Sequence, residues 1–334
     1  MNISSIPFTT QTEFVSYPSG FQLCKVGTII HYEKDASFPI FGFSLNTNPE
    51  IAKRIALSEL YERCLAFSCM QRKNIDKDGT MSAYHYVNQN SESRLSIEHI
   101  LLDSNSLTLD ASGLSFHTTH ELACQHSILE LIERHLLVKL WFSNSFSLIQ
   151  MRDSLEISPD YFLTRYSGIG IFGSLFSITI IESIHEKNSE SDIWLFGSAF
   201  ALRTEDAMRK SDQEAYMLLD NLESSRELFF STHDSHSRIQ SLKGSLSQKR
   251  RAYFSSKIIK QSDITKTYTE TPVGANIINV LNWLNIDPFE VLMVDLYGSL
   301  DGYGVRAFCN SLLRVRESRR LTCNKKNIPL DPFC

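Results

Sequence analysis

A short acidic motif occurs twice in this sequence, in two segments that we expect to be helical. The motif Glu-x-x-Glu-Arg spans residues 59–63 and again 130–134, so its two copies start 71 residues apart. Residues three positions apart on a helix project to the same side, and two such helices side by side would bring four carboxylates into one cleft. Because clustered carboxylates repel one another, this pattern is typical of sites for a hard divalent cation such as Mg²⁺, with phosphates as natural further ligands. The four carboxylates are those of Glu59, Glu62, Glu130 and Glu133.

Ordinary ion pairs are the alternative interpretation of the same motif. In each copy the first Glu and the Arg are four residues apart, which is the spacing of solvated salt bridges within a helix, worth a few tenths of a kcal/mol each. The context of the second copy argues against a purely solvated role, because apolar residues between Ile128 and Leu137 surround most of that helix. We therefore expect at least one of Glu130 and Glu133 to be partly buried.

Composition narrows the classes of protein that this chain can belong to. The chain has 334 residues, of which 42% are hydrophobic and 21% charged, as in a globular protein. Its net charge of −5 lacks the basic excess that binds a nucleic-acid backbone. The first twenty residues have no signal-peptide pattern, and no apolar run is long enough to cross a membrane. These features predict a cytoplasmic protein with neither nucleic acid nor membrane as its partner.

The cysteines and histidines do not predict a metal centre. Seven cysteines are scattered without a Cys-x-x-Cys pair, so we expect buried thiols. The four histidines near the second acidic helix are not arranged in metalloprotease order, and the sequence has none of the common glycine-rich nucleotide loops. We interpret Glu121 as a helix-capping residue, and Glu214 as a possible surface position on a later helix.

Hydrophobic periodicity predicts interleaved strands and helices. Strands are expected over residues 21–32, 38–45, 169–183, 192–202, 289–296 and 305–315. Helices are expected from Asn48 as N-cap, from the capping-box pattern Thr118–Glu121, from Thr204, and over residues 277–284. The fold class is therefore α/β, or more loosely α+β. We expect a single domain over residues 1–334, with a β-rich segment at 1–45, a polar insertion at 222–270 and a tail at 317–334.

The acidic helices and the loop before the second one together resemble the YcaO family. The segment Ala111-Ser112-Gly113 is followed, 17 residues after its glycine, by the second acidic motif, as in the family's central segment. The first acidic helix, the strand and helix around Glu214, and the strand pair at residues 291–314 are also similar to YcaO segments. The resemblance runs from about residue 45 to 316 and implies mixed sheets, with the glutamate helices around a nucleotide cleft.

This resemblance implies an ATP- and Mg²⁺-dependent enzyme. YcaO proteins phosphorylate the oxygen of a peptide-backbone amide after a nucleophile has attacked its carbonyl, and loss of phosphate leaves an azoline, thioamide or amidine in a bacteriocin-like natural product. It implies that Glu59, Glu62, Glu130 and Glu133 hold Mg²⁺ and phosphates, with Ser112 and Arg134 near the nucleotide. A ribosomally made precursor peptide would be the substrate, an E1-like or TfuA-like protein would deliver its leader, and the chain would form a homodimer.

Departures from the family pattern keep two other hypotheses open. The chain has Asn46-Thr47-Asn48, Ile55, Ala111 and Leu122 where the family has Gly-Lys-Gly, Ser, Asn and Glu, and it has only two prolines in its last seven residues. One alternative is a degenerate YcaO-like scaffold that binds peptide or a partner enzyme without ATP turnover. The other is an unrelated α/β protein with ordinary salt-bridged helices.

Overall fold

The computed structural model describes twelve segments of the chain. They are residues 10–16, 21–32, 36–70, 79–96, 112–142, 147–151, 154–169, 175–184, 193–224, 244–259, 275–299 and 302–312. The tail expected at 317–334 and most of the insertion expected at 222–270 lie outside them. Contacts divide the chain into two compact units, which we call unit 1 (1–131 and 285–312) and unit 2 (132–284 and 313–334). The expectation of a single domain over residues 1–334 stays a prediction.

The described residues form thirteen strands, five α-helices and one 3-10 turn. The strands are β1 (Gln11–Ser16), β2 (Gln22–Tyr32), β3 (Ala36–Asn46), β4 (Thr80–His85), β5 (Asn88–Ser96), β6 (Leu114–His117), β7 (Leu148–Gln150), β8 (Leu155–Ser158), β9 (Tyr161–Gly168), β10 (Phe176–Ser183), β11 (Trp194–Phe200), β12 (Leu292–Ser299) and β13 (Gly302–Phe308). The helices are α1 (Pro49–Met70), α3 (His120–Phe142), α4 (Thr204–Ser224), α6 (Gly244–Ser255), α7 (Ile277–Trp283) and the 3-10 turn η5 (Pro288–Glu290), so the described elements include six helical segments in all.

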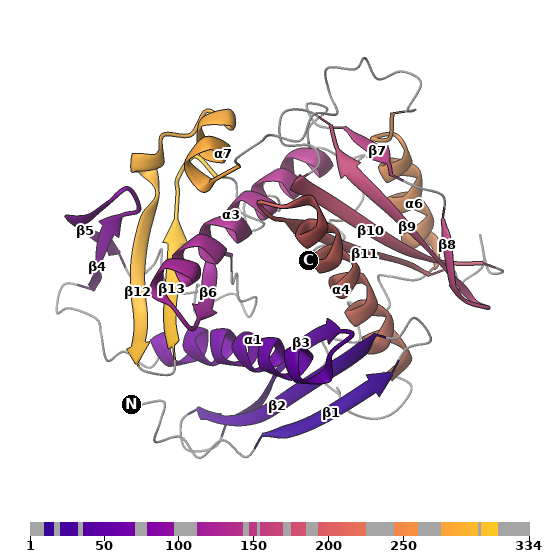
Figure 1. Ribbon diagram of the computed structural model, residues 1–334, viewed down its shortest axis with the longest axis horizontal. Coiled ribbons are helices and arrows are strands. Elements are labelled where there is room, and N and C mark those ends of the chain that lie inside the picture. The colour runs from indigo at the N-terminus through magenta and orange to yellow at the C-terminus, as the bar shows by residue number, and fades with distance from the viewer. Residues whose placement is uncertain are drawn as a thin grey trace. The chain divides into compact units, whose positions relative to one another are not determined.

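Unit 1 contains two antiparallel sheets. The first has the order β1-β2-β3 and is covered by α1, whose buried Ala52, Ala56 and Leu60 pack against Val26 and Ile40 (Figure 1). The second has the order β5-β4-β12-β13-β6, so the late hairpin β12–β13 inserts between strands that come much earlier in the chain. Strands before residue 132 and strands after residue 284 therefore form one sheet.

Unit 2 is built on a single antiparallel sheet with the order β11-β10-β9-β7, to which β8 adds beside β9. Helix α4 covers β10 and β11 (Figure 1). Aromatic side chains fill the region near α6, where the ring of Phe254 lies 5.6 Å from that of Trp194 and 5.8 Å from that of Phe196. Strand β11 is buried along its whole length, as its continuous apolar sequence predicts.

Most of the expected elements are confirmed. Asn48 caps α1, because its side-chain oxygen accepts the backbone N–H of Glu50 at 2.9 Å and that of Ile51 at 3.3 Å. The capping box expected at Thr118–Glu121 is wrong by one residue: α3 begins at His120, and the Thr119 hydroxyl accepts the N–H of Leu122. Glu121 instead receives a hydrogen bond from Gln125. The strand expected at 289–296 begins at Leu292, because Pro288 starts a 3-10 turn before it.

The three-stranded sheet and helix of unit 1 recur in unit 2. In both, an antiparallel meander leads directly into a helix that covers its last two strands: β1-β2-β3-α1 in one and β9-β10-β11-α4 in the other. Helices α1 and α4 begin 155 residues apart, as do Gly42 on β3 and Gly197 on β11. At both glycines a Cβ atom would overlap the helix backbone, at Ala56 in unit 1 and Ser211 in unit 2. The close approach of strand and helix therefore requires glycine at both places.

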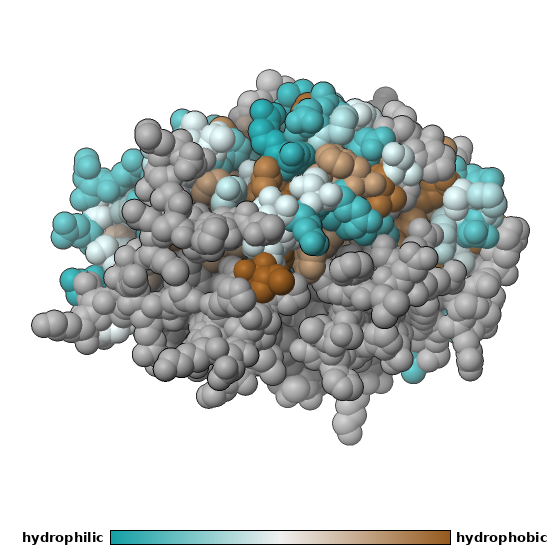
Figure 2. All heavy atoms as spheres, turned by 90° about the horizontal axis from the view of Figure 1, so that it is seen from below, coloured by the Kyte–Doolittle hydropathy of each residue, from teal (hydrophilic) through white to brown (hydrophobic). Residues whose placement is uncertain are grey.

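The surface and the thiols agree with the composition. Large apolar side chains that are exposed occur singly, on several elements, and Figure 2 shows hydrophilic and hydrophobic residues interspersed on the face that it presents. No helix in the described segments is long and apolar enough to cross a membrane. Cys24, Cys64, Cys124 and Cys309 are buried free thiols, as expected.

Candidate functional site

Glu59 on α1 binds the backbone of the strand beneath it. Its Oε2 accepts the N–H of Phe43 at 2.6 Å, and its Oε1 pairs with Arg63 at 2.5 Å. Arg63 in turn donates to the carbonyl of Phe41 at 2.8 Å. The side chains of Glu59 and Arg63 are 24% and 43% exposed, so the intrahelical ion pair of the alternative interpretation is present, at a partly buried place. Both partners also fasten α1 to β3.

Glu62 lies one turn further along α1 and contacts the other sheet of unit 1. Its Oε1 accepts the N–H of Phe116 on β6 at 2.9 Å, and the Phe116 ring packs 5.1 Å from that of Tyr61. The two carboxylates of the first acidic motif are thus both held by strand amides, one from each sheet.

Ser112, the residue that the resemblance implies near the nucleotide, is buried in the turn that leads into β6. The next residue fixes that turn, because the carbonyl of Gly113 accepts hydrogen bonds from the Ser127 hydroxyl and from the N–H of Ala307 at 2.8 Å. Gly113 has a positive φ of 76°, which residues with a side chain rarely adopt. The loop is therefore held by both α3 and β13 within unit 1.

Helix α3 carries Glu130, Glu133 and Arg134 of the second motif. Glu130 and Arg134 are half-buried, whereas Glu133 is only 9% exposed. Burial raises the pKa of Glu133, although Arg134 and a hydrogen bond from Ser198 oppose the rise. The expectation that one carboxylate of this pair is buried is confirmed, and a bound cation would offset the cost of ionising it.

Ser198 on β11 brings two carboxylates of unit 2 together. Its hydroxyl donates to Glu133 Oε1 at 2.9 Å, and its backbone N–H donates to Glu214 Oε2 at 3.0 Å. The N–H of Phe200, two residues on, completes the binding of Glu133 at 3.4 Å. Glu214 is therefore not a simple surface residue of α4. It belongs with the acidic group.

Glu214 occupies the same place in unit 2 that Glu59 occupies in unit 1. Each lies 17 residues after its strand glycine and accepts the N–H of the residue that follows that glycine. The repeated acidic motif associates α1 with α3, but the structural repeat associates α1 with α4. A weak sequence signal marks it, since seven residues recur at the 155-residue spacing: Phe41, Gly42, Glu50, Ala52, Arg54, Glu59 and Tyr61 match Phe196, Gly197, Glu205, Ala207, Arg209, Glu214 and Tyr216.

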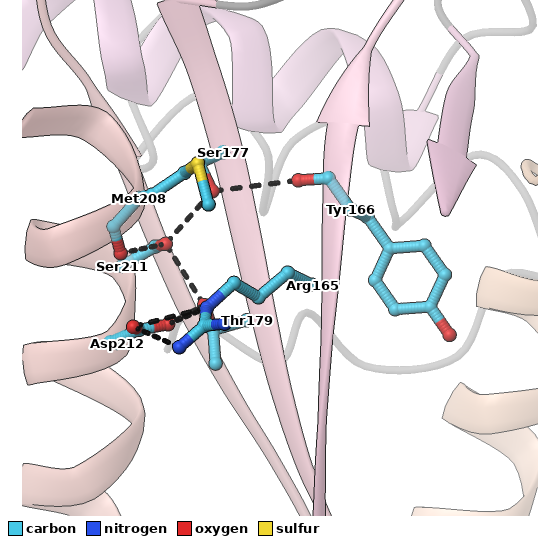
Figure 3. Close-up of polar contacts among 7 residues, drawn as sticks. All are labelled: Arg165, Tyr166, Ser177, Thr179, Met208, Ser211 and Asp212. Atoms are coloured by element: carbon cyan, nitrogen blue, oxygen red, sulfur yellow. Dashed lines mark hydrogen bonds and ion pairs between the residues drawn. The ribbon is translucent and has the colours of Figure 1, made fainter. Parts of the chain in front are cut away.

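A buried polar network fastens α4 to the sheet of unit 2 (Figure 3). Asp212 on α4 receives two parallel hydrogen bonds from the Arg165 guanidinium of β9, at 3.0 and 2.8 Å, and a third from the Thr179 hydroxyl of β10 at 2.7 Å. Ser211 continues the network to Thr179 at 2.9 Å and to Ser177 at 3.0 Å. This network fixes the segment of α4 next to Glu214.

The donor set is compatible with Mg²⁺ and phosphate, though not with a preformed metal cage. Among the described residues, no group of three or more His, Cys, Asp or Glu side chains is placed to hold a metal ion by itself. Magnesium usually takes one or two carboxylates and completes its shell with water and phosphate oxygens, so such a cage is not required. The buried Glu133 carboxylate, with its raised pKa, is the donor in this set that a cation would most stabilise.

Two of the departures from the family pattern are apolar and open to solvent. Ile55 on α1 and Leu122 on α3 are each 36% exposed. Neither can donate a hydrogen bond to a phosphate, so any phosphate contact on these helices must come from other side chains.

Comparison with solved structures identifies the fold. No family model matches the sequence, and no curated protein matches it. YcaO from Methanopyrus kandleri bound with AMPPCP and Mg²⁺ is 11% identical, with a TM-score of 0.58 over 96% of this chain and 88% of that one. The E. coli microcin synthetase McbBCD complex with pro-MccB17 bound gives 15% identity and a TM-score of 0.61 over 92% and 89%. A heterocyclase in complex with substrate and cofactor gives 12% and 0.62, over 91% of this chain and 50% of that one.

The chain therefore has the YcaO fold. The similarity to these structures covers more than nine tenths of the chain, so the expected YcaO-like fold is confirmed. At 11–15% identity the likeness concerns the fold, and function has to be argued from the side chains.

Proposed function

We propose that this chain is an ATP- and Mg²⁺-dependent enzyme that activates backbone amides of a ribosomally made precursor peptide. The observation that carries the proposal is the set of helix carboxylates held by strand amides, on a fold that binds AMPPCP and Mg²⁺ in the M. kandleri protein. Phosphorylation converts an amide oxygen into a good leaving group, and Mg²⁺ neutralises the charge that develops on the phosphates.

In this proposal the acidic side chains bind Mg²⁺ and the phosphates of ATP. Glu59, Glu62, Glu130 and Glu133 would hold Mg²⁺ and phosphates, with Ser112 and Arg134 near the nucleotide. We add Glu214, because it shares a strand residue with Glu133 and repeats the environment of Glu59. Convergence of all these carboxylates on one nucleotide is part of the proposal.

The product is an azoline or, with an external nucleophile, a thioamide or amidine. The similarity to a microcin synthetase with pro-MccB17 bound and to a heterocyclase favours the azoline. A leader-binding partner of the E1-like or TfuA-like kind, a homodimer and a cytoplasmic location belong to the same proposal.

Glu130→Gln with Glu133→Gln tests the assigned carboxylates. The probes are Mg-ATP and a synthetic peptide rich in Cys and Ser. Peptide-dependent ATP consumption should fall to background, because two ligands of the cation lose their charge. Glu121→Gln is the matched control, since Glu121 lies on the same helix, is exposed and accepts a hydrogen bond from Gln125 on its own helix. Turnover that persists in a folded double variant would show that the assigned site is wrong.

A degenerate scaffold without ATP turnover is the second candidate, and one observation favours it. Both oxygens of Glu59 already accept a hydrogen bond, one from the Phe43 amide and the other from Arg63, so a cation would have to share an oxygen with one of these donors. Calorimetry with Mg-ATP separates the two candidates. Binding that weakens in Glu133→Gln supports the enzyme, and absence of binding by the folded wild-type protein supports the scaffold.

A further inference from the structure

Three polar side chains from three distant parts of the sequence meet in unit 1. The hydroxyl of Tyr84 on β4 lies 2.9 Å from His120 Nε2 and 2.9 Å from Asp295 Oδ1. His120 Nε2 lies 2.9 Å from the same Asp295 oxygen. His120 is the first residue of α3, and Asp295 is on β12. We call this group the His120 cluster.

The hydrogen-bond pattern assigns the protons. The Asp295 carboxylate only accepts, so the Tyr84 hydroxyl donates to it and His120 Nε2 must carry a hydrogen to bond there as well. In the neutral imidazole the other nitrogen, Nδ1, is then the basic one. Burial, with Cys124 and Asp295 nearby, raises the pKa of Tyr84, so the phenol stays protonated and serves as a donor.

Cys124 is a neighbour of this cluster but not its nucleophile. Its Sγ lies 3.8 Å from His120 Nδ1 and 3.9 Å from Nε2, and a sulfur equidistant from both nitrogens lies on the lone-pair axis of neither. The residue is 2% exposed, and burial raises the pKa of its thiol. The sulfur and the ring of Tyr303, 5.7 Å away, instead hold the imidazole in place.

Exposure distinguishes the His120 cluster from a purely structural clamp. The side chain of His120 is 30% exposed and that of Asp295 is 54% exposed, so a ligand can reach both. Along the chain, His120 lies between two parts of the candidate site. Phe116, whose amide binds Glu62, is four residues before His120, and Glu130 is ten residues after it, about 15 Å along α3.

We propose that His120 is a general base for the amide-activating reaction, with Asp295 and Tyr84 as its positioning residues. The inference rests on the proposed function. The substrate class it serves is a peptide with a Cys, Ser or Thr side chain, or an external sulfur or amine nucleophile.

The reaction begins with nucleophilic attack on the amide carbonyl. The nucleophile's heteroatom bonds to the amide carbon while its proton passes to His120 Nδ1, and the carbonyl π electrons move to the oxygen. The imidazolium is stabilised by Asp295. The oxyanion takes the γ-phosphoryl group of ATP, releasing ADP. Phosphate then leaves with the C–O electron pair while the nitrogen lone pair forms the C=N bond, and the departing phosphate takes the proton of the amide nitrogen. The imidazolium of His120 releases its proton to solvent, so one ATP is converted to ADP and phosphate for each ring.

Kinetics of His120→Gln test the role, because Gln keeps a hydrogen-bond donor for Asp295 but has no basic nitrogen. With Mg-ATP and the synthetic peptide rich in Cys and Ser, kcat for loss of water from the peptide should fall about 10²- to 10³-fold with KM unchanged. Asp295→Asn should lower kcat less, also at constant KM. His126→Gln, on the same helix and outside the cluster, is the control and should keep wild-type kcat. A folded His120→Gln variant with wild-type kcat overturns the proposal.

A second measurement does not depend on turnover. In ¹⁵N NMR spectra of the full chain at pH 8, the signals lost in His120→Gln should be those of a neutral imidazole protonated at Nε2. A ring protonated at Nδ1 overturns the proposal even if the enzyme is active. Wild-type protein that binds no Mg-ATP and leaves the peptide unchanged overturns the proposed function first, and this inference with it.

Discussion

The two strand–helix repeats have one architecture but different interiors. Val26 pairs with Gly42 in unit 1 as Thr179 pairs with Gly197 in unit 2, and these pairs align the two meanders residue by residue. Where β2 and α1 contribute apolar side chains to the core of unit 1, β10 and α4 contribute polar ones. The matched positions are Cys24, Val26, Ala56 and Leu57 in unit 1, and Ser177, Thr179, Ser211 and Asp212 in unit 2.

This difference shows that the backbone arrangement does not dictate what holds a helix on its sheet. In unit 1 the helix is held by removing apolar surface from water, which tolerates small changes in any one side chain. In unit 2 it is held by a satisfied polar network, in which loss of one member leaves the others buried and unpaired. Four sets of variants can break or sharpen this contrast.

Asp212→Ala should have the largest effect. It leaves the Arg165 guanidinium, 25% exposed, without its carboxylate, and we expect the free energy of unfolding to fall by about 4 kcal/mol in urea titrations. The unit 1 counterpart, Leu57→Ala, should cost about 2 kcal/mol because Leu57 is only partly buried. Arg165→Met combined with Asp212→Leu should return to within about 1 kcal/mol of wild type, and a double variant as unstable as Asp212→Ala would contradict the network interpretation.

Gly42→Ala and Gly197→Ala should come next, at about 3 kcal/mol each, because the added Cβ meets helix backbone that no side-chain rotation can clear. Thermal unfolding of the two variants should give similar losses, since the close approach is common to both repeats. Gly79→Ala is the control: it has a positive φ but open space around it, and should cost about 1 kcal/mol. Unequal losses at the two repeat glycines would break the equivalence.

Exchanging valine and threonine between the repeats should lower the free energy of unfolding by different amounts in the two variants. Val26→Thr places a hydroxyl among Cys24, Ile40 and Ala56, and should cost about 2 kcal/mol. Thr179→Val removes one of three donors to Asp212 while Arg165 stays, and should cost about 1 kcal/mol. Chemical denaturation of both variants checks the order, and the reverse order would mean that the hydroxyl is the main anchor of the network.

The helix caps should give the smallest effects. Asn48→Ala removes the acceptor for two amides of α1 and should cost about 1 kcal/mol. Arg203 takes the matching position before α4, where its carbonyl accepts the N–H of Ala207 at 3.1 Å, but its side chain cannot accept. Arg203→Asn should therefore stabilise the protein by about 0.5 kcal/mol in the same titrations. A loss of stability in that variant would show that the Arg203 side chain has a role of its own.

Local patterns predicted most of the elements, and pairing between distant segments was not predictable. The cap at Asn48, the β-rich runs of β2 and β3, and the apolar run of β11 each depend on adjacent residues, and all are confirmed. The start of α3 was misplaced because Thr118 and Thr119 are adjacent and only geometry selects the one that caps. Burial at Glu133 followed from the apolar residues around it.

The acidic group and the His120 cluster show the same difference between local patterns, which the sequence reveals, and contacts between distant segments, which it does not. The repeated motif located four carboxylates, but it could not reveal that Glu214 matches Glu59, because that relation depends on two strand amides. The contact between Tyr84 and Asp295 joins residues 211 positions apart and exists because β4 pairs with β12. No local spacing carries that information.

The discontinuity of unit 1 sets an order of events during synthesis. Strand β6 pairs with β13 and strand β4 with β12, so two strands made early wait for a hairpin made near residue 300. At ordinary translation rates that delay is about 10 to 40 s, and the continuous segment of unit 2 is synthesised during it, before the hairpin. Tyr84 and His120 can form their hydrogen bonds with Asp295 only after the hairpin has been synthesised. The His120 cluster can therefore form in the nascent chain only after β12 and β13, the last strands of this sheet to be synthesised.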